Sequence, residues 1–351
     1  MLEFTDRGIY CPVADLYIDP WKPVSRAVIT HGHSDHARPG NERYLATRAA
    51  APVISHRLGD VTIDTVAFGE TRRVNGVAIS LHPAGHIPGS AQVRLEYRGE
   101  VWVVSGDYKA EADGLSETFQ PLACDTFITE CTFGLPAFKW RPQADVIAEI
   151  NAWWAQNAEA GRVSVLGAYA LGKAQRILAN IDTGVGPVFT HGAVEATNEV
   201  LRAQGLALPP TILVVPEMER GVYTRGLVIA PPSALGTTWM RRFGEVSTAF
   251  ASGWMAVRGI RRRRAADRGF VMSDHVDWPA LNAAIDATGA SQVFVTHGYT
   301  QVMRRWLDSR GIAAGIVATQ FEGEQLDSSD AEKSQAASSD GSESSAVDDT
   351  P

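Results

Sequence analysis

The sequence HGHSDH at positions 31–36 places three histidines and one aspartate in six residues. Aspartate is rarely buried without a partner, and clustered imidazoles desolvate one another unless a positive charge lies between them. Imidazole nitrogens and carboxylate oxygens are ligands of zinc and similar divalent ions. Residues 26–30, Arg-Ala-Val-Ile-Thr, are rich in apolar and β-branched side chains and predict a buried strand directly before the cluster. We therefore expect a fold in which a buried strand ends at a metal-binding loop, rather than a chance histidine-rich turn.

Three other predicted strands are also followed by a histidine or an aspartate. The pairs of strand and residue are 77–80 with His86, 101–105 with Asp107, and 293–296 with His297. Ligand crevices in α/β proteins lie at the carboxyl ends of the strands, where such residues converge. The sequence thus predicts one site built from four strand ends.

These motifs, in this order, resemble the metallo-β-lactamase fold: HxHxDH at 31–36, GHxxGSA at 85–91 and SGDY at 105–108. The segment FITECTFG at 127–134 resembles the first motif of the β-CASP group of nucleic-acid-cutting members, which is a strand with an acidic residue. MSDHVD at 272–277 and VTHG at 295–298 resemble the two late histidine motifs of that group. SGWM at 252–255, the arginine run at 261–264 and ALGKAQ at 170–175 are most similar to the bacterial ligase-associated DNA exonucleases. The resemblance covers residues 8–321.

The resemblance implies an α/β fold, namely an αββα metallo-β-lactamase sandwich with an inserted βαβ lobe. Helical patterns at 142–154, 172–182 and 193–205 alternate with strand-like segments at 163–166, 187–190 and 211–215, which favours a parallel sheet in that lobe. Further helices are expected at 279–288 and 299–310. The expected parts are 1–135 and 251–321 for the sandwich, 136–250 for the inserted lobe and 322–351 for a disordered tail.

The family pattern also implies a set of metal ligands. His31, His33 and His86 are expected to bind one ion, Asp35, His36 and His297 a second, and Asp107 to bridge the two. Seven ligand side chains exceed what one tetrahedral zinc ion uses, so we expect two divalent ions, zinc or alternatively manganese. Such a pair activates water and neutralises phosphoryl oxygens during cleavage of a phosphodiester.

Four residues are expected to support the reaction: His275, Glu130, Asp19 and Asp35, the last also as a metal ligand. His275 matches the family residue that contacts the scissile phosphate and donates a proton to the leaving oxygen, and Glu130 is its expected partner. Asp274 stands next to His275 and could compete with Glu130 for it. Asp19 matches an early acidic position and is expected to orient a ligand histidine, with a plain turn before Pro20 as the alternative.

Charge is unevenly distributed along the chain. From Glu322 to Pro351 there are nine acidic residues and one lysine, so the net charge of −8 of the whole chain belongs to this tail and residues 1–321 are neutral. The tail is expected to be disordered and to act as a solubilising extension, with a partner-binding arm as the alternative. Six arginines lie between 258 and 268, and five of them are expected to contact a phosphate backbone rather than to form a solvated surface: Arg258, Arg261, Arg262, Arg263 and Arg264.

The function expected from these features is a binuclear-metal DNA exonuclease acting in DNA repair, with nucleic acid as partner. An ATP-dependent DNA ligase and a helicase are further partners implied by the resemblance. The alternatives are an RNA-processing β-CASP ribonuclease, a small-molecule metallohydrolase of the same fold, and a non-catalytic binding subunit. Three cysteines without C-x-x-C spacing predict reduced thiols, and the chain shows no signal segment and no membrane-length apolar run. We therefore expect a cytoplasmic protein.

Overall fold

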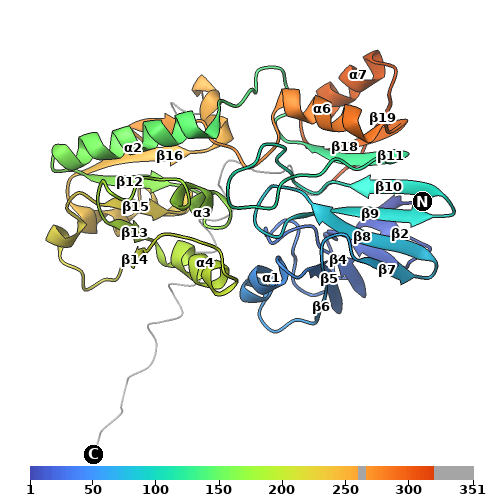
Figure 1. Ribbon diagram of the computed structural model, residues 1–351, viewed down its shortest axis with the longest axis horizontal. Helices are drawn as coiled ribbons and strands as arrows, with labels where there is room; N and C mark the ends of the chain where they lie inside the picture. The colour runs from blue at the N-terminus through green and yellow to red at the C-terminus, as the bar shows by residue number, and fades with distance from the viewer. Residues whose placement is uncertain (260–265, 320–351) are drawn as a thin grey trace, which may run out of the picture.

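The computed structural model describes residues 1–259 and 266–319 as a mixed α/β fold (Figure 1). Within these residues the strands form three sheets, here named A, B and C. Sheets A and B lie together in one lobe, and sheet C forms the second lobe with helices α2, α3 and α4. The disordered-tail prediction for 322–351 and the arginines at 261–264 lie outside the described residues.

Sheet A is formed by the N-terminal strands in sequence order. They are β1 (Glu3–Thr5), β2 (Gly8–Cys11), β3 (Leu16–Ile18), β4 (Arg26–Val28), β5 (Arg43–Thr47) and β6 (Ile63–Val66). From β3 onward the pairing is parallel, so β3, β4, β5 and β6 end at the same edge. The HGHSDH loop leaves this edge directly after β4, as the sequence predicts.

Sheet B contains the other three strands that precede predicted ligands. Its order is β19 (Ala313–Ile316), β18 (Gln292–Gly298), β11 (Thr126–Cys131), β10 (Glu100–Val104), β9 (Ala91–Tyr97), β8 (Val77–Pro83) and β7 (Thr71–Val74). β10, β11 and β18 run parallel to one another, which brings Asp107, Glu130 and His297 to one edge although the first and last are far apart in sequence.

The first lobe is layered because both sheets are apolar on the faces that meet. Ile18 and Val28 of sheet A share one buried cluster with Val93 and Ile128 of sheet B. The outer face of sheet A packs on α1 (Ala51–Leu58), and that of sheet B packs on α6 (Trp278–Thr288) and α7 (Thr300–Ser309). The layer order is therefore helix, sheet, sheet, helix.

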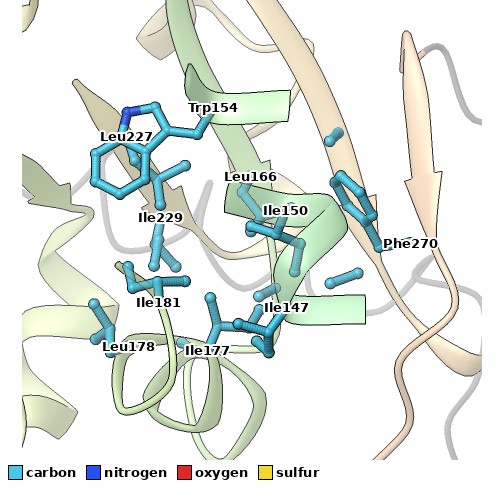
Figure 2. Close-up of a cluster of buried hydrophobic side chains, with 14 of the residues drawn as sticks. Ile147, Ile150, Trp154, Leu166, Ile177, Leu178, Ile181, Leu227, Ile229 and Phe270 are labelled. Atoms are coloured by element: carbon cyan, nitrogen blue, oxygen red, sulfur yellow. The ribbon is translucent and has the colours of Figure 1, made fainter. Parts of the chain in front are cut away.

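Sheet C is entirely parallel, with the order β14 (Ile212–Leu213), β13 (Val188–Thr190), β15 (Leu227–Ala230), β12 (Val163–Gly167), β16 (Val246–Ala251) and β17 (Arg268–Phe270). Helices α2 (Gln143–Glu159) and α3 (Lys173–Leu178) pack on it, and α4 (Gly192–Ala203) follows β13. Figure 2 shows the core under α2 and α3, where Ile150 and Ile177 meet Leu166 and Ile229 of the sheet. This packed core holds in place the residues of the second lobe that face the first lobe.

Several boundaries differ from the sequence expectations, among them those of sheet C and of α3. Sheet C does not stop at residue 250, because β17 at 268–270 pairs in parallel with β16 and completes the sheet. Helix α3 ends at Leu178 rather than at 182, and the backbone amides of Asn180 and Ile181 still bond to Ile177 in a closing turn. In the described part of the chain no helix has the length and apolar character needed to cross a membrane.

Candidate metal centre and the adjoining His275–Glu130 pair

Three histidines direct one ring nitrogen each toward a common point. His33 Nδ1 lies 3.2 Å from His31 Nε2 and 3.0 Å from His86 Nε2. His31 and His86 are fully buried or nearly so, at 0% and 2% exposure, and His33 is partly buried. Together with Asp107 they form a group whose potential ligand atoms all lie within 4.8 Å of one another. The structure thus unites the residues expected to bind the first ion.

The opposite ring nitrogens of two of these histidines face backbone carbonyls. His33 Nε2 is 3.1 Å from the carbonyl oxygen of Leu171, and His86 Nδ1 is 2.9 Å from that of Asp274. A carbonyl only accepts, so each of these nitrogens carries the proton and the nitrogen facing the centre has a free lone pair. Both rings are thereby held in the tautomer that binds a metal ion.

Asp107 connects this first group to a second one. Its Oδ2 lies 3.6 Å from His31 Nε2 and 3.4 Å from His36 Nε2, and its Oδ1 lies 3.6 Å from His297 Nδ1. His36, Asp107 and His297 form the second group of potential ligands. The turn before Asp107 needs Gly106, because its φ is +58° and a Cβ there would lie 2.7 Å from Cβ of Thr30. The backbone at His297 is also left-handed, with φ +56°.

Two aspartates lie beside His36 in different ways. Asp19 Oδ2 is 2.7 Å from His36 Nδ1 and accepts the Thr30 hydroxyl at 2.5 Å, so it contacts a predicted ligand histidine. Asp35 Oδ2 is 3.8 Å from His36 Nε2, and Asp35 is not part of the compact second group. The structure therefore places six of the seven predicted ligands in the two groups and Asp35 next to them.

The electrostatics of the centre favour a bound cation. Burial lowers the pKa of His31 well below its usual value and that of His86 to about 3, so these imidazoles are neutral and available as ligands. Burial also opposes protonation of His36, but Asp107, Asp35 and Asp19 outweigh it and raise the pKa of His36 well above the usual range. The carboxylates thus stabilise positive charge at the second group.

Unsatisfied polar atoms mark the same place. Across residues 1–259 and 266–319, the buried side-chain atoms that lack a hydrogen-bond partner include His36 Nε2, Asp107 Oδ1 and His297 Nδ1. Buried polar atoms are normally paired, and these three face one another. Their chemistry fits a divalent ion with nitrogen and carboxylate ligands.

Glu130 and His275 form a buried pair at the edge of the centre. Nδ1 of His275 lies 3.0 and 2.9 Å from the two carboxylate oxygens of Glu130, which is 0% exposed. Glu130 also accepts the Tyr108 amide at 2.8 Å and the Thr132 hydroxyl at 2.6 Å. The ring of His275 lies 4.7 Å from that of His86, so the pair adjoins the first ligand group.

Asp274, the residue that could compete with Glu130 for His275, has two cations of α3 as partners. Its carboxylate lies 3.4 Å from Lys173 Nζ and 3.1 Å from Arg176 Nη1. Although burial opposes ionisation, these two cations lower the pKa of Asp274 well below its usual value. The ALGKAQ segment at 170–175 was singled out as a motif, but the pairing of the α3 cations with Asp274 and with the carbonyl of Ser273 was not predicted.

The remaining residues singled out in the sequence have other positions. His56 is exposed on α1, His82 contacts Ser80, and His191 accepts the Ala193 amide as the N-cap of α4. Arg258 is exposed, and it is the only member of the expected backbone-contact set within the described residues.

Similar proteins were found by sequence and by structure, and no protein-family model matches the chain. A protein of Opitutus terrae named probable DNA ligase is 30% identical over 315 residues, which is 89% of this chain but 30% of that protein. Endoribonuclease ysh1 of Aspergillus fumigatus is 32% identical over 123 residues, and Endoribonuclease YSH1 of Saccharomyces cerevisiae is 30% identical over 122. These matches cover 34% of this chain and 14% and 15% of the relatives, so the chain spans a minor part of each relative.

A solved structure shares the fold. The crystal structure of a protein of unknown function from Enterococcus faecalis superimposes with a TM-score of 0.55 over 85% of this chain and 80% of that one. The two sequences are 9% identical, so this likeness concerns the fold alone.

Proposed function

We propose that the chain is a metallo-β-lactamase-fold phosphodiesterase of the β-CASP group that cleaves nucleic acid with two divalent metal ions. The observation that carries this proposal is the position of Asp107 between two ligand groups, with the Glu130–His275 pair beside them. The order helix, sheet, sheet, helix and the parallel sheet C fit the same group. Relatives named as endoribonucleases and as a DNA ligase give further support.

The residues divide the chemistry among them. His31, His33 and His86 would hold one ion, His36 and His297 with Asp35 the other, and Asp107 both. Bound there, divalent ions supply Lewis-acid activation of water and neutralise charge on the phosphoryl group. Asp19 fixes His36 through the 2.7 Å contact, so that its Nε2 faces Asp107.

His275 has the geometry of a proton donor to the leaving oxygen. Its Nδ1–H is held by Glu130, and the other ring nitrogen, Nε2, is the one we propose to act on the substrate. The negative charge of Glu130 favours the doubly protonated imidazolium, whose Nε2–H protonates an alkoxide as it leaves. An alkoxide is a poor leaving group, so such a donor accelerates cleavage of a phosphodiester.

DNA is the substrate we propose, in an exonuclease reaction that prepares ends for repair. The relative matched over 89% of this chain is named for DNA ligation, whereas the endoribonucleases match over 34%. We further propose that the protein works with a DNA ligase. To test this partnership, the protein and a DNA ligase are incubated together with a damaged DNA end. Trimming and joining of that end are then compared with the reaction of each enzyme alone.

The decisive experiment uses DNA and RNA strands labelled at either end, incubated with protein loaded with zinc or manganese. We expect stepwise shortening of DNA from one end and loss of roughly 10²–10⁴ in rate for His275→Ala, with metal content unchanged. The matched control is His56→Ala, an exposed histidine that belongs to none of the ligand groups, which should keep full activity. Cleavage of RNA but not DNA would favour the ribonuclease, and no cleavage of either by metal-loaded protein would refute the proposal.

A further inference from the structure

Three charged side chains are buried together where α3 meets the segment that carries His275. Lys173, Arg176 and Asp274 are only 1%, 4% and 3% exposed. Arg176 Nη1 contacts Asp274 Oδ1 at 3.1 Å, and Lys173 Nζ lies 3.4 Å from Oδ2. Burying charges costs free energy unless they are paired, and replacing such a group by apolar residues is often no loss of stability. Their presence at this place therefore calls for a reason other than stability.

The group is directly connected to the metal centre through backbone carbonyls. Arg176 Nη1 also donates to the carbonyl of Ser273 at 2.5 Å, so the guanidinium holds the backbone before His275 as well as the Asp274 side chain. The carbonyl of Asp274 is the acceptor for His86 Nδ1. One arginine of the second lobe thus fixes the partner of a predicted ligand in the first.

The residues just before α3 make a second connection. The carbonyl of Leu171 is the acceptor for His33 Nε2. Close packing sets its position: a Cβ on Gly172, whose φ is +92°, would lie 2.3 Å from Cγ2 of Ile87 in the His86 loop. Leu171 and Ile87 belong to one apolar cluster with Val53 of α1 and Leu201 of α4, which spans both lobes. The two lobes are therefore closely packed next to His33 and His86.

We propose that Arg176, together with Asp274 and Lys173, is a positioning device that makes metal binding depend on contact between the two lobes. The inference rests on the proposed metal site. With the lobes in contact, the carbonyls of Leu171 and Asp274 fix His33 and His86 in the metal-binding tautomer and orientation. If the second lobe moves away from the first, His33 loses the carbonyl of Leu171. The carbonyl of Asp274, which accepts from His86, is then no longer held in place by Arg176. By linkage, an ion at the first group favours contact between the lobes to the same degree.

The test measures binding of Co²⁺ to the full chain, by titration against a competing chelator and by the visible absorption spectrum of the bound ion. Arg176→Met removes the bond to Ser273, the pair with Asp274 and the bond from Nε to Gln143 of α2, while Lys173 remains to pair with the Asp274 carboxylate. We expect affinity at the first site to fall about 10- to 100-fold, the usual effect of losing a partner of a ligand histidine, with a changed spectrum. Arg176→Lys keeps the charge and should restore part of the affinity.

The matched control is Arg202→Met, which breaks a pair between Arg202 Nη1 and Glu195 at 2.7 Å inside the same lobe, away from the centre. Both variants should unfold at lower temperature, but only Arg176→Met should lose Co²⁺ affinity. Wild-type affinity and spectrum in Arg176→Met would overturn the inference, and Arg176→Lys answers the same question if the methionine variant does not fold. Wild-type protein without Co²⁺ binding would refute the metal site itself. This test measures metal binding and not nucleic-acid cleavage. A protein that binds Co²⁺ but is inactive in the separate cleavage assay would therefore contradict only the proposed function.

Discussion

Replacing Glu130 by glutamine tests the Glu130–His275 pair with almost no change of shape. Oε1 accepts the Tyr108 backbone amide at 2.8 Å, and this donor has no alternative direction. The amide oxygen of a glutamine must therefore stay at the Oε1 position, which places its NH₂ group at the Oε2 position. There it faces the Thr132 hydroxyl at 2.6 Å and His275 Nδ1 at 2.9 Å. The hydroxyl turns to accept, but the imidazole accepts only after its proton moves to Nε2.

The magnitude follows from this exchange. One hydrogen bond between charged partners is replaced by a neutral one, and bonds to charged groups contribute about 1.5–3 kcal/mol against about 1 kcal/mol for neutral bonds. We therefore expect Glu130→Gln to lower the free energy of unfolding by about 1–2 kcal/mol. The rate should fall much further, by about 10²–10⁴, because the doubly protonated imidazolium loses the charge that stabilises it.

The assay is single-turnover cleavage of end-labelled DNA by metal-loaded protein, together with metal analysis and thermal unfolding. Thr132→Val is the matched control, since it removes a donor to the same carboxylate without touching His275. It should reduce the rate by about tenfold or less. Folded, metal-loaded Glu130→Gln protein that cleaves at the wild-type rate would refute the role of the pair.

Three further predictions concern other parts of the chain. Asp107→Ala should abolish binding of both ions, because Asp107 is shared by both ligand groups, and elemental analysis that finds two ions in this variant would contradict the binuclear site. The double variant Arg262→Ala, Arg264→Ala should bind DNA of every sequence more weakly, and the slope of log affinity against log salt concentration should flatten by about one unit per lost contact. An unchanged slope would mean that the arginine run is a solvated surface feature. Deletion of residues 324–351 should leave turnover intact. Burial raises the pKa of Cys124 to about 11, so its labelling by a thiol reagent should be slow at pH 8 and accelerate as the pH approaches 11, and fast labelling at pH 8 would show that it is not buried as described.

The core of the candidate site could be predicted because it is encoded locally. Each ligand-type residue lies near the carboxyl end of a strand or shortly after it, and the sequence shows both the strand and the residue. Parallel pairing then brings the strand ends together: β10, β11 and β18 deliver Asp107, Glu130 and His297 to one edge of sheet B. The pattern of apolar runs fixed where the strands lie, and the chemistry of the residues after them indicated what the edge does.

The extent of sheet C was harder to predict, because an edge strand has little signal of its own. β17 is three residues long and only Phe270 is buried, so its pattern does not differ from that of a loop. Its place depends on pairing with β16, and the two strands are separated by a connection that includes the arginine run. Pairing partners of this kind are set by the tertiary fold rather than by local sequence.

The acceptors behind the histidines are the part that no residue type reveals. The carbonyl that faces His33 belongs to a residue 138 positions away, and the one that faces His86 to a residue 188 positions away. Every residue has a carbonyl, so the identities of Leu171 and Asp274 do not mark them as partners of a ligand. The sequence does contain the charged residues that hold these carbonyls in place: a lysine and an arginine in a short buried helix, opposite a buried aspartate. Buried charges without an evident role in the reaction are therefore a guide to where one lobe positions the other.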